Sequence, residues 1–196
     1  LSNAYSLLEQ NGKNIAGDNI NVAVIDTGIN LTHSEFSGNK IRTFSDGINR
    51  DYANNDADIS DVDGHGSHVA GIIAANRDNY GMHGVAFNAI IVGYKVFDDN
   101  NSGTNTNVTN AINQSINDSV SIVNLSLGFD NQVSDVRSKL VSAKNNDILT
   151  LSASGNDTAD NPMHPAFYAS DPDLQNYILS VGSVDSKNNI SSFSNL

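Results

Sequence analysis

Cysteine is absent from the 196-residue sequence, and no apolar run approaches the roughly 18 residues that a membrane-spanning helix needs. Without cysteine, the chain can form no disulfide scaffold, no zinc–thiolate site and no cysteine nucleophile. The opening residues also lack the basic and then apolar pattern of a secretory signal peptide. We therefore expect a soluble globular chain, in a compartment that the missing cysteine does not fix.

Positive charge is also scarce: 10 Lys and Arg face 22 Asp and Glu, which gives a net charge of −12. Such a surface repels a phosphate backbone or an anionic bilayer, so we expect no nucleic-acid partner and no membrane contact by this domain. Repeats and Pro-rich or Gly/Ser-rich linkers are missing too, and one domain over residues 1–196 is the simplest division. Ser2-Asn3-Ala4 resembles a cloning scar and is left out of the predicted fold.

Apolar, β-rich runs alternate with helix-like stretches along the chain. The first run, residues 21–26, stops at Asp26-Thr27-Gly28, as a buried parallel strand that ends in a loop would. Further strands are expected at 89–96, 121–125, 148–153 and 177–184, and helices at 66–76, 108–118 and 133–145. This alternation predicts an α/β fold, with a parallel sheet sandwiched between helices.

Polar residues follow three of the predicted strands, at Asp26, at Ser126-Leu127-Gly128 and at Gly155-Asn156. In parallel α/β sheets the ligand lies beyond the carboxyl ends of the strands. We therefore expect one cleft to gather these three segments.

Asp26 and His65 are the strongest candidates for chemistry. Either residue alone is more often structural, but His65 lies between Gly64 and Gly66 at the start of a small-residue helix, which lets neighbouring backbone approach closely. A carboxylate that orients an imidazole is the pair that activates a hydroxyl nucleophile.

Four segments together carry a family resemblance. In order, they are Val24-Ile25-Asp26-Thr27-Gly28, Gly64-His65-Gly66-Ser67-His68-Val69-Ala70-Gly71, Asn124-Leu125-Ser126-Leu127-Gly128 and Ala153-Ser154-Gly155-Asn156. Along nearly its whole length the chain resembles the subtilisin-like serine proteases, or subtilases. The stretches at 71–78 and 81–86 are most similar to the autotransporter branch of Gram-negative bacteria, which implies a secreted or bacterial cell-surface protein.

The resemblance implies a serine endopeptidase with a polypeptide substrate and a subtilisin-like fold. Asp26 would orient His65, His65 would act as general base, and the Asn156 side chain would donate to the oxyanion. A peptide would be held as an added strand between two segments, and the side chain before the cleaved bond would enter a neighbouring pocket. The substrate-binding residues implied are Ser102, Gly103, Ser126, Leu127, Gly128, Ala153 and Gly155.

The sequence departs from the family in one respect. A subtilase nucleophile lies in a Gly-Thr-Ser-Met-Ala-like motif, a few tens of residues beyond the segment that matches Ser191-Ser192-Phe193-Ser194, and this sequence ends at Leu196. We therefore expect an incomplete peptidase domain that is inactive alone and poorly stable. A C-terminal segment of the same protein is the partner expected to complete it.

Three other interpretations are compatible with parts of the sequence. A metallohydrolase could use Asp26, His65 and His68, and a catalytically inactive subtilase fold could serve binding or surface display. Asp78 and Glu35 could ligate calcium, although a solvated polar turn is favoured there. We expect no metal and no other cofactor. The acidic stretch formed by Asp46 and residues 51–63 is interpreted as a solvated insertion.

Overall fold

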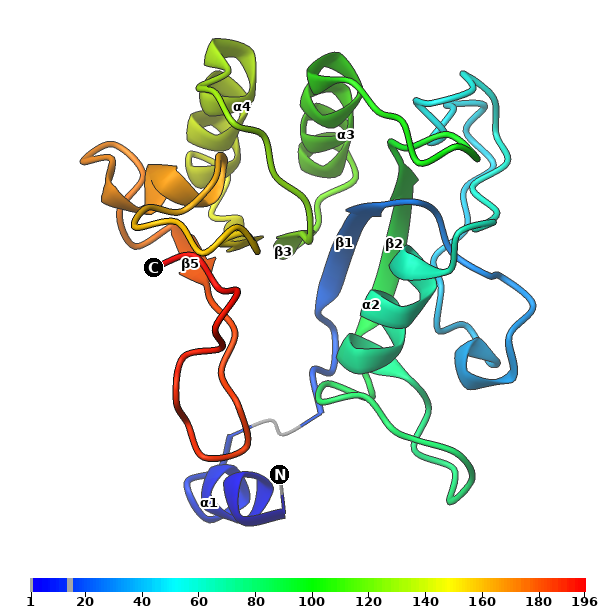
Figure 1. Ribbon diagram of the computed structural model, residues 1–196. Coiled ribbons are helices and arrows are strands. Elements are labelled where there is room, and N and C mark those ends of the chain that lie inside the picture. The colour runs from blue at the N-terminus through cyan, green and yellow to red at the C-terminus, as the bar shows by residue number, and fades with distance from the viewer. Residues whose placement is uncertain (1, 14–15) are drawn as a thin grey trace.

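A parallel β-sheet forms the centre of the molecule (Figure 1). The structure, a computed structural model, describes residues 2–13 and 16–196. In that part of the chain the sheet has the strand order β2-β1-β3-β4-β5. The strands are β1 (Asn21–Asp26), β2 (Ile90–Lys95), β3 (Ile122–Leu125), β4 (Leu149–Ala153) and β5 (Ile178–Val181). Burial on both faces of a central strand explains its near-continuous apolar sequence. The predicted α/β class is confirmed.

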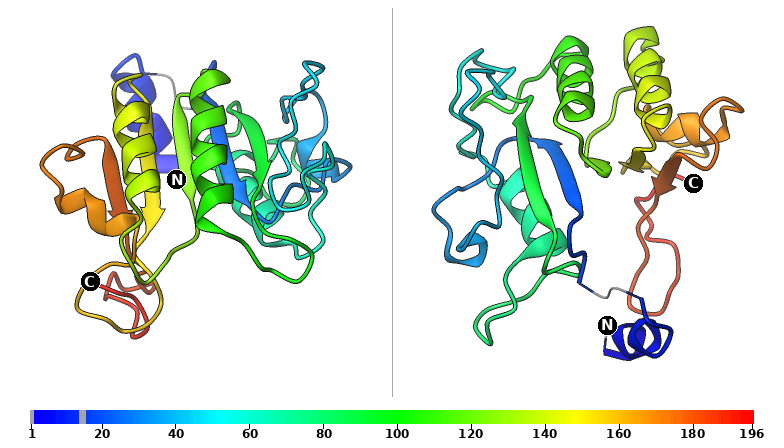
Figure 2. Two further views of the ribbon diagram at one scale, coloured as in Figure 1. Left: turned by 90° about the horizontal axis from the view of Figure 1, so that it is seen from above. Right: turned by 180° about the vertical axis from the view of Figure 1, so that it is seen from behind.

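Helices cover the two faces of the sheet unequally. On one face lie α3 (Asn105–Asn117) and α4 (Ser134–Lys144), whereas α2 (His65–Ala74) packs on the other face against β1 and β2 (Figures 1 and 2). The larger apolar core lies under α3 and α4, and a smaller core lies under α2. These helices correspond to the three predicted ones.

The start of α3 differs from its predicted start at residue 108. Thr104 caps the helix by accepting a 3.1 Å hydrogen bond from the Asn107 N–H. The first turn, Asn105-Thr106-Asn107, is polar and exposed, so it lacks the apolar periodicity on which the prediction depended.

Leaving Ser2-Asn3-Ala4 out of the fold was wrong. These residues form the first turn of α1 (Ser2–Gln10), a short helix without Gly, Pro or β-branched residues. The Tyr5 hydroxyl donates to the carbonyl of Val85, and its ring meets Phe87 edge to face at 6.0 Å. None of the helices in the described part of the chain is long and apolar enough to cross a membrane.

The acidic stretch at Asp46 and 51–63 is solvated only in part, contrary to the prediction. The chain before it forms isolated bridges along the outer edge of β2, so that Asp51 lies opposite Lys95 and is 1% exposed. Arg50 is also buried, and it binds Asp118 at 2.7 Å. This burial escaped prediction because Arg50 and its partner Asp118 are 68 residues apart in the sequence.

The second face of β3, β4 and β5 carries apolar side chains with little cover. Strand register places Leu151 beside Leu179 and Ala153 beside Val181, all on the face opposite α3 and α4. Leu179 and Val181 are 46% and 51% exposed. Within the described residues, α2 covers this face of the sheet only at β1 and β2 (Figure 2).

Candidate active site

Asp26 is the last residue of β1, and its side chain is 1% exposed. Its Oδ1 accepts a 2.7 Å hydrogen bond from the backbone N–H of Thr27. Gly28 then turns the chain with a φ of 118°, and a Cβ there would lie 2.5 Å from the carbonyl oxygen of Ile59. Only glycine suits this turn, which fixes the loop that leaves Asp26.

His65 opens α2, directly after Gly64, which is in the left-handed region at φ 99°. Its Nδ1 lies 2.7 Å from Asp26 Oδ1, while 48% of the side chain remains exposed. Gly66 permits this approach, because a Cβ at Gly66 would lie 2.3 Å from the Gly28 carbonyl oxygen. The predicted pair is therefore formed: a buried carboxylate holds one ring nitrogen, and the ring itself is open to solvent.

The burial of Asp26 has an electrostatic consequence. Desolvation raises the pKa of the Asp26 carboxyl, and the hydrogen bonds from His65 and Thr27 offset only part of that effect. The second oxygen, Oδ2, is buried without a hydrogen-bond partner among the described residues. A positive charge on His65 would add to this compensation.

Asp61 is a further residue of the site that the sequence analysis missed. One of its carboxylate oxygens accepts from Thr27 Oγ1 at 2.8 Å and from the Gly64 N–H. The other accepts from the N–H and the hydroxyl of Ser67, at 2.8 and 2.6 Å. Asp61 thus joins the loop after Asp26 to the first turn of the helix that begins with His65.

Hydrogen bonding also decides the ionisation of Asp61. Partial burial acts to raise the pKa of this carboxyl, but the donors from Ser67, Gly64 and Thr27 outweigh it and hold the pKa below its ordinary value. The signal in the sequence was an Asp four residues before His65, which appeared as one acid among many in the stretch 51–63.

Asn156 lies in the exposed loop that follows β4. No hydrogen bond holds its side-chain amide to any residue that the structure describes, so the amide is free to donate to a bound group. Gly155 precedes it with a φ of 110°, and its backbone packs against Met163. Among the described residues no hydrogen bond joins Asn156 to Asp26 or His65, and its function remains a prediction.

The predicted substrate segments also lie near the carboxyl ends of the strands. Ser102 and Gly103 are in the loop after β2, where Gly103 bridges to Phe97. A pocket of about 300 Å³ is lined by Gly103 together with Leu127 and Gly128. Ser126, Ala153 and Val181 line a second pocket of about 210 Å³.

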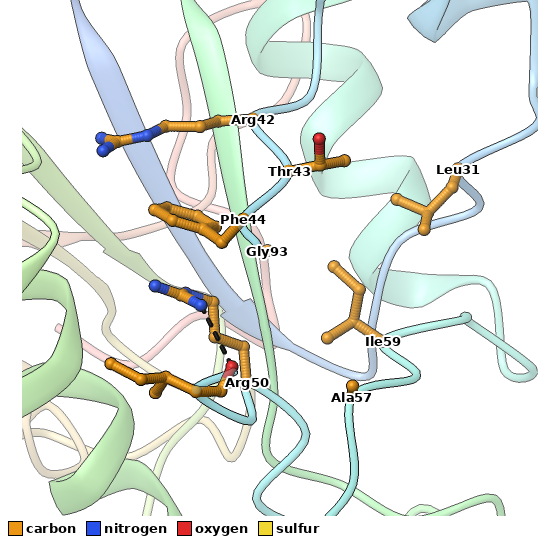
Figure 3. Close-up of a pocket in the computed structure, with 9 residues that line it drawn as sticks. Leu31, Arg42, Thr43, Phe44, Arg50, Ala57, Ile59 and Gly93 are labelled. Carbon is orange, nitrogen blue, oxygen red and sulfur yellow. Dashed lines mark hydrogen bonds between the residues drawn. The ribbon is translucent and has the colours of Figure 1, made fainter. Parts of the chain in front are cut away.

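A third pocket, of about 220 Å³, lies outside this region, along the outer edge of β2 (Figure 3). Leu31 and Ile59 lie on one side of the pocket and Phe44 on the other, with the Phe44 ring between the guanidinium groups of Arg42 and Arg50. Arg50 is neutralised by Asp118 and Asp46, and the Arg42 guanidinium donates to the carbonyl of Asp118. The stacked cations are thus already engaged with the protein, and this pocket adds nothing to the Asp26–His65 site.

The alternative metal ligands do not gather. In the described ranges, no three His, Asp or Glu side chains are arranged to hold a metal ion, so His68 does not join Asp26 and His65 in a cluster. The Asp78 carboxylate instead accepts from the N–H of Tyr80 and closes a turn.

Comparisons with known proteins agree with this geometry. The model of the Subtilase family (Peptidase_S8) matches residues 17–196. The chain is 37% identical to the "Major intracellular serine protease" of Bacillus subtilis (strain 168), over 93% of this chain and 56% of that protein. It is 34% identical to the "Minor extracellular protease Epr" of the same strain, over 92% of this chain and 26% of that protein. A crystal structure of a cold adapted subtilisin-like serine proteinase superposes with a TM-score of 0.77 at 34% identity, and it covers 93% of this chain and 61% of the other.

Proposed function

Because the chain belongs to the subtilase family, we propose that it forms the larger part of a serine endopeptidase domain whose base is His65. The observation that carries the proposal is the 2.7 Å contact between His65 Nδ1 and the buried Asp26 carboxylate. That contact leaves the other ring nitrogen, Nε2, to accept the proton of a serine hydroxyl. The chain spans 56% or less of the curated relatives named above, so the activity of the whole protein is part of the proposal.

The three polar residues have different tasks in the proposed reaction. Asp26 fixes the tautomer of His65 and stabilises the imidazolium that forms when His65 takes the proton. His65 later returns the proton to the leaving amine, and the nitrogen of the Asn156 amide donates to the oxyanion. The peptide substrate lies as an added strand beside Ser102-Gly103 and Ser126-Leu127-Gly128, whose backbone recognises it without regard to sequence.

The nucleophile is proposed to come from a segment outside residues 1–196. Among the described residues no serine hydroxyl is hydrogen-bonded to His65, and Ser67 and Ser154 are engaged with Asp61 and Asn195. Support comes from the sparsely covered face of β3–β5 and its pocket between Ser126, Ala153 and Val181. A helix that carried the nucleophile would cover those apolar side chains.

Two further stretches of the sequence bear on the branch of the family and on the location of the protein. The likeness of residues 71–78 and 81–86 to the autotransporter branch favours a secreted or cell-surface peptidase. The relatives named above include both an intracellular and an extracellular protease, so the family alone does not fix the location.

The test compares residues 1–196 with the longer polypeptide that contains them, on a chromogenic peptide. We expect hydrolysis by the longer polypeptide only, and loss of that activity on His65→Ala substitution or on treatment with a fluorophosphonate. His68→Ala, an exposed histidine of the same helix, is the matched control and should retain activity.

Two results would change the assignment. Activity that survives fluorophosphonate but is lost to a zinc chelator, and is also lost on His68→Ala substitution, would favour the metallohydrolase. A longer polypeptide that hydrolyses no peptide and does not react with fluorophosphonate would favour the inactive binding domain.

A further inference from the structure

Asn195 is a buried polar residue close to the proposed oxyanion donor, and only 3% of it is exposed. Its Oδ1 accepts two backbone hydrogen bonds from the loop after β4, from the Asp157 N–H at 2.8 Å and from the Ala159 N–H at 3.1 Å. An amide oxygen has room for two such donors, so both of its acceptor positions are used.

The backbone around Asn195 holds the same loop from the other side. The N–H of Asn195 donates to the Gly155 carbonyl, and its own carbonyl accepts from Ser154 Oγ, both at 3.1 Å. Asn195 therefore holds the residues on both sides of Asn156. The side chain of Asn156 itself has no hydrogen bond in the described part of the protein.

Gly155 makes the approach of Asn195 possible. A Cβ at Gly155 would lie 2.5 Å from Asn195 Nδ2 and 2.8 Å from Met163 Cγ, and its φ of 110° is one that side chains rarely adopt. The fit around Gly155 is too close for another residue type, so the loop has little freedom where it presents Asn156.

We propose that Asn195 is a positioning residue of the oxyanion site: its side-chain oxygen fixes the loop 155–159 so that the Asn156 amide faces the cleft. This inference rests on the proposed function, because it takes Asn156 as the donor. A donor stabilises the oxyanion only when it is already oriented as the charge develops, so a looser loop should lower kcat more than it changes KM.

The decisive experiment is a double-mutant cycle in the active polypeptide, with Asn195→Leu, Asn156→Ala and both substitutions together. Leucine has a similar size but no acceptor for the two N–H groups. We expect Asn195→Leu alone to lower kcat roughly 10- to 100-fold with KM nearly unchanged, and Asn156→Ala to lower it roughly 100- to 1000-fold. If Asn195 acts through Asn156, adding Asn195→Leu to Asn156→Ala should lower kcat by less than about threefold more.

Hydrogen exchange of the Asp157 and Ala159 amides provides a readout that does not need activity. Exchange should become at least about tenfold faster in Asn195→Leu. Hydrogen exchange should stay slow in Asn195→Asp, which keeps an accepting oxygen. It should also stay slow in the control Asn189→Leu, which makes the same substitution at an exposed position of the same segment. Should Asn195→Leu fail to fold, Asn195→Ser takes its place, since its short hydroxyl cannot reach both N–H groups.

The outcomes separate the two proposals. The positioning role is overturned if Asn195→Leu lowers kcat by the same factor in the wild-type enzyme and in the Asn156→Ala variant. Unchanged hydrogen exchange at Asp157 and Ala159 in Asn195→Leu also overturns it. Unchanged kcat in Asn156→Ala overturns the oxyanion role of Asn156, and the positioning role falls with it even where the exchange data show that Asn195 holds the loop.

Discussion

At the scale of single residues, the Asp26 carboxylate is buried with only part of its hydrogen-bonding capacity used. Its Oδ1 accepts from His65 and Thr27, but Oδ2 is buried with no partner that the structure describes. Burying a charge is costly unless an opposite charge accompanies it. The imidazolium that forms when His65 takes a proton supplies that charge, so the environment of Asp26 stabilises the reaction state more than the resting state.

Asp26→Asn should therefore change stability and activity in opposite directions. Because the folded-state pKa of Asp26 is raised, its ionised form opposes folding; this cost is absent below the unfolded pKa of about 4 and appears as pH rises above it. We expect the Asp26→Asn variant to unfold at a higher urea concentration than wild type at pH 7, but not at pH 3. We expect kcat to fall roughly 10³- to 10⁴-fold, because an amide can hold the wrong tautomer of His65. Equal or lower stability at pH 7 would contradict the desolvation argument.

Asp61→Asn tests a pKa shift in the opposite direction. Here the folded-state pKa is lowered, so the ionised carboxylate stabilises the fold above the unfolded pKa of about 4, and this contribution is lost as pH falls through the folded pKa. We expect a loss of about 1–2 kcal/mol at neutral pH, reduced from the usual value for charged hydrogen bonds by the partial exposure of Asp61. Urea unfolding should show that the difference in free energy of unfolding between wild type and Asp61→Asn shrinks from pH 7 to pH 3. The control Asp160→Asn, at an exposed position, should show no such difference at any pH.

The residues of the site differ in how far the sequence could predict them. Asp26 and His65 were predictable because each stands at the boundary of an element, and His65 is also flanked by Gly64 and Gly66. Asp61 was not, because it stands among many acids and only the folded chain brings its donors from Thr27, Gly64 and Ser67 together. Asn195 was not, because its side chain acts through hydrogen bonds from backbone groups, which leave no trace in residue identity. For Asn195 the partners lie 36 and 38 residues earlier in the chain, across a turn that no local pattern specifies.

At the scale of elements, a buried ionic cluster joins the segment before Asp51 to the end of α3. Asp118 accepts two hydrogen bonds from Arg50, at 2.7 and 2.8 Å, and one each from Tyr94 and Gln114. The Arg50 side chain and Asp118 are both 6% exposed. The cluster is thus fully paired, and it connects β2, α3 and the bridged segment along the sheet edge.

Removing one partner of this cluster should be far more costly than breaking a surface pair. We expect Asp118→Ala to lower the free energy of unfolding by about 3–5 kcal/mol, since Arg50 would stay buried with only Asp46 to pair with. The control is Asp173→Ala, which breaks an ion pair of Arg137 with a partner 70% exposed and should cost at most about 1 kcal/mol. Similar losses in the two variants, by urea denaturation, would show that burial does not govern this cluster.

The elements of the sheet were better predicted than the elements around it. Each strand is an apolar run between turn residues, and few structures besides a buried strand produce that pattern at this length. The first turn of α3 is polar and exposed, so periodicity gave no signal for it. The helix α1 is largely exposed even at Leu7 and Leu8, so it has no apolar side buried in the core. The bridged segment at residues 41–51 was missed because its pairing depends on the sheet edge that it follows.

The elements around Met163 also set an expectation for specificity. The side chain before the cleaved bond is expected to enter a pocket whose two walls are the segments Ser126-Leu127-Gly128 and Ser152-Ala153-Ser154-Gly155. A Cβ on Gly128 or on Gly155 would lie close to Met163, so the Met163 side chain fills the space between the two walls. The walls are small and uncharged, and each CH₂ buried there is worth about 0.8 kcal/mol. We expect kcat/KM to be higher for peptides with Phe or Leu before the cleaved bond than for otherwise identical peptides with Lys or Glu there. A dominant preference for Lys would point to the Asp157 carboxylate, with Asp157→Asn as the next variant to measure.

At the scale of the whole molecule, α3 and α4 cover one face of the sheet, whereas in the described part of the chain α2 covers the other face only at β1 and β2. Helices α3 and α4 bury one face of β3 and β4, whereas Leu179 and Val181 stand half-exposed on the opposite face. Adjacent large apolar side chains on a sheet face mark a surface that another element covers. The relatives named above are longer than this chain, and the superposed crystal structure extends beyond it as well.

Leu179→Thr with Val181→Thr should therefore have opposite effects in the short and the long polypeptide. In residues 1–196 alone, the substitutions remove exposed apolar surface, so we expect less aggregation and less binding of a hydrophobic dye. In the longer polypeptide the same side chains should be buried, and two threonines there should lower the free energy of unfolding by about 2–4 kcal/mol. Val62→Thr, in an exposed loop where valine is 65% exposed, is the matched control and should change neither. If the long polypeptide tolerates both threonines without loss of stability, this face of the sheet stays open, and the nucleophile must reach His65 by another route.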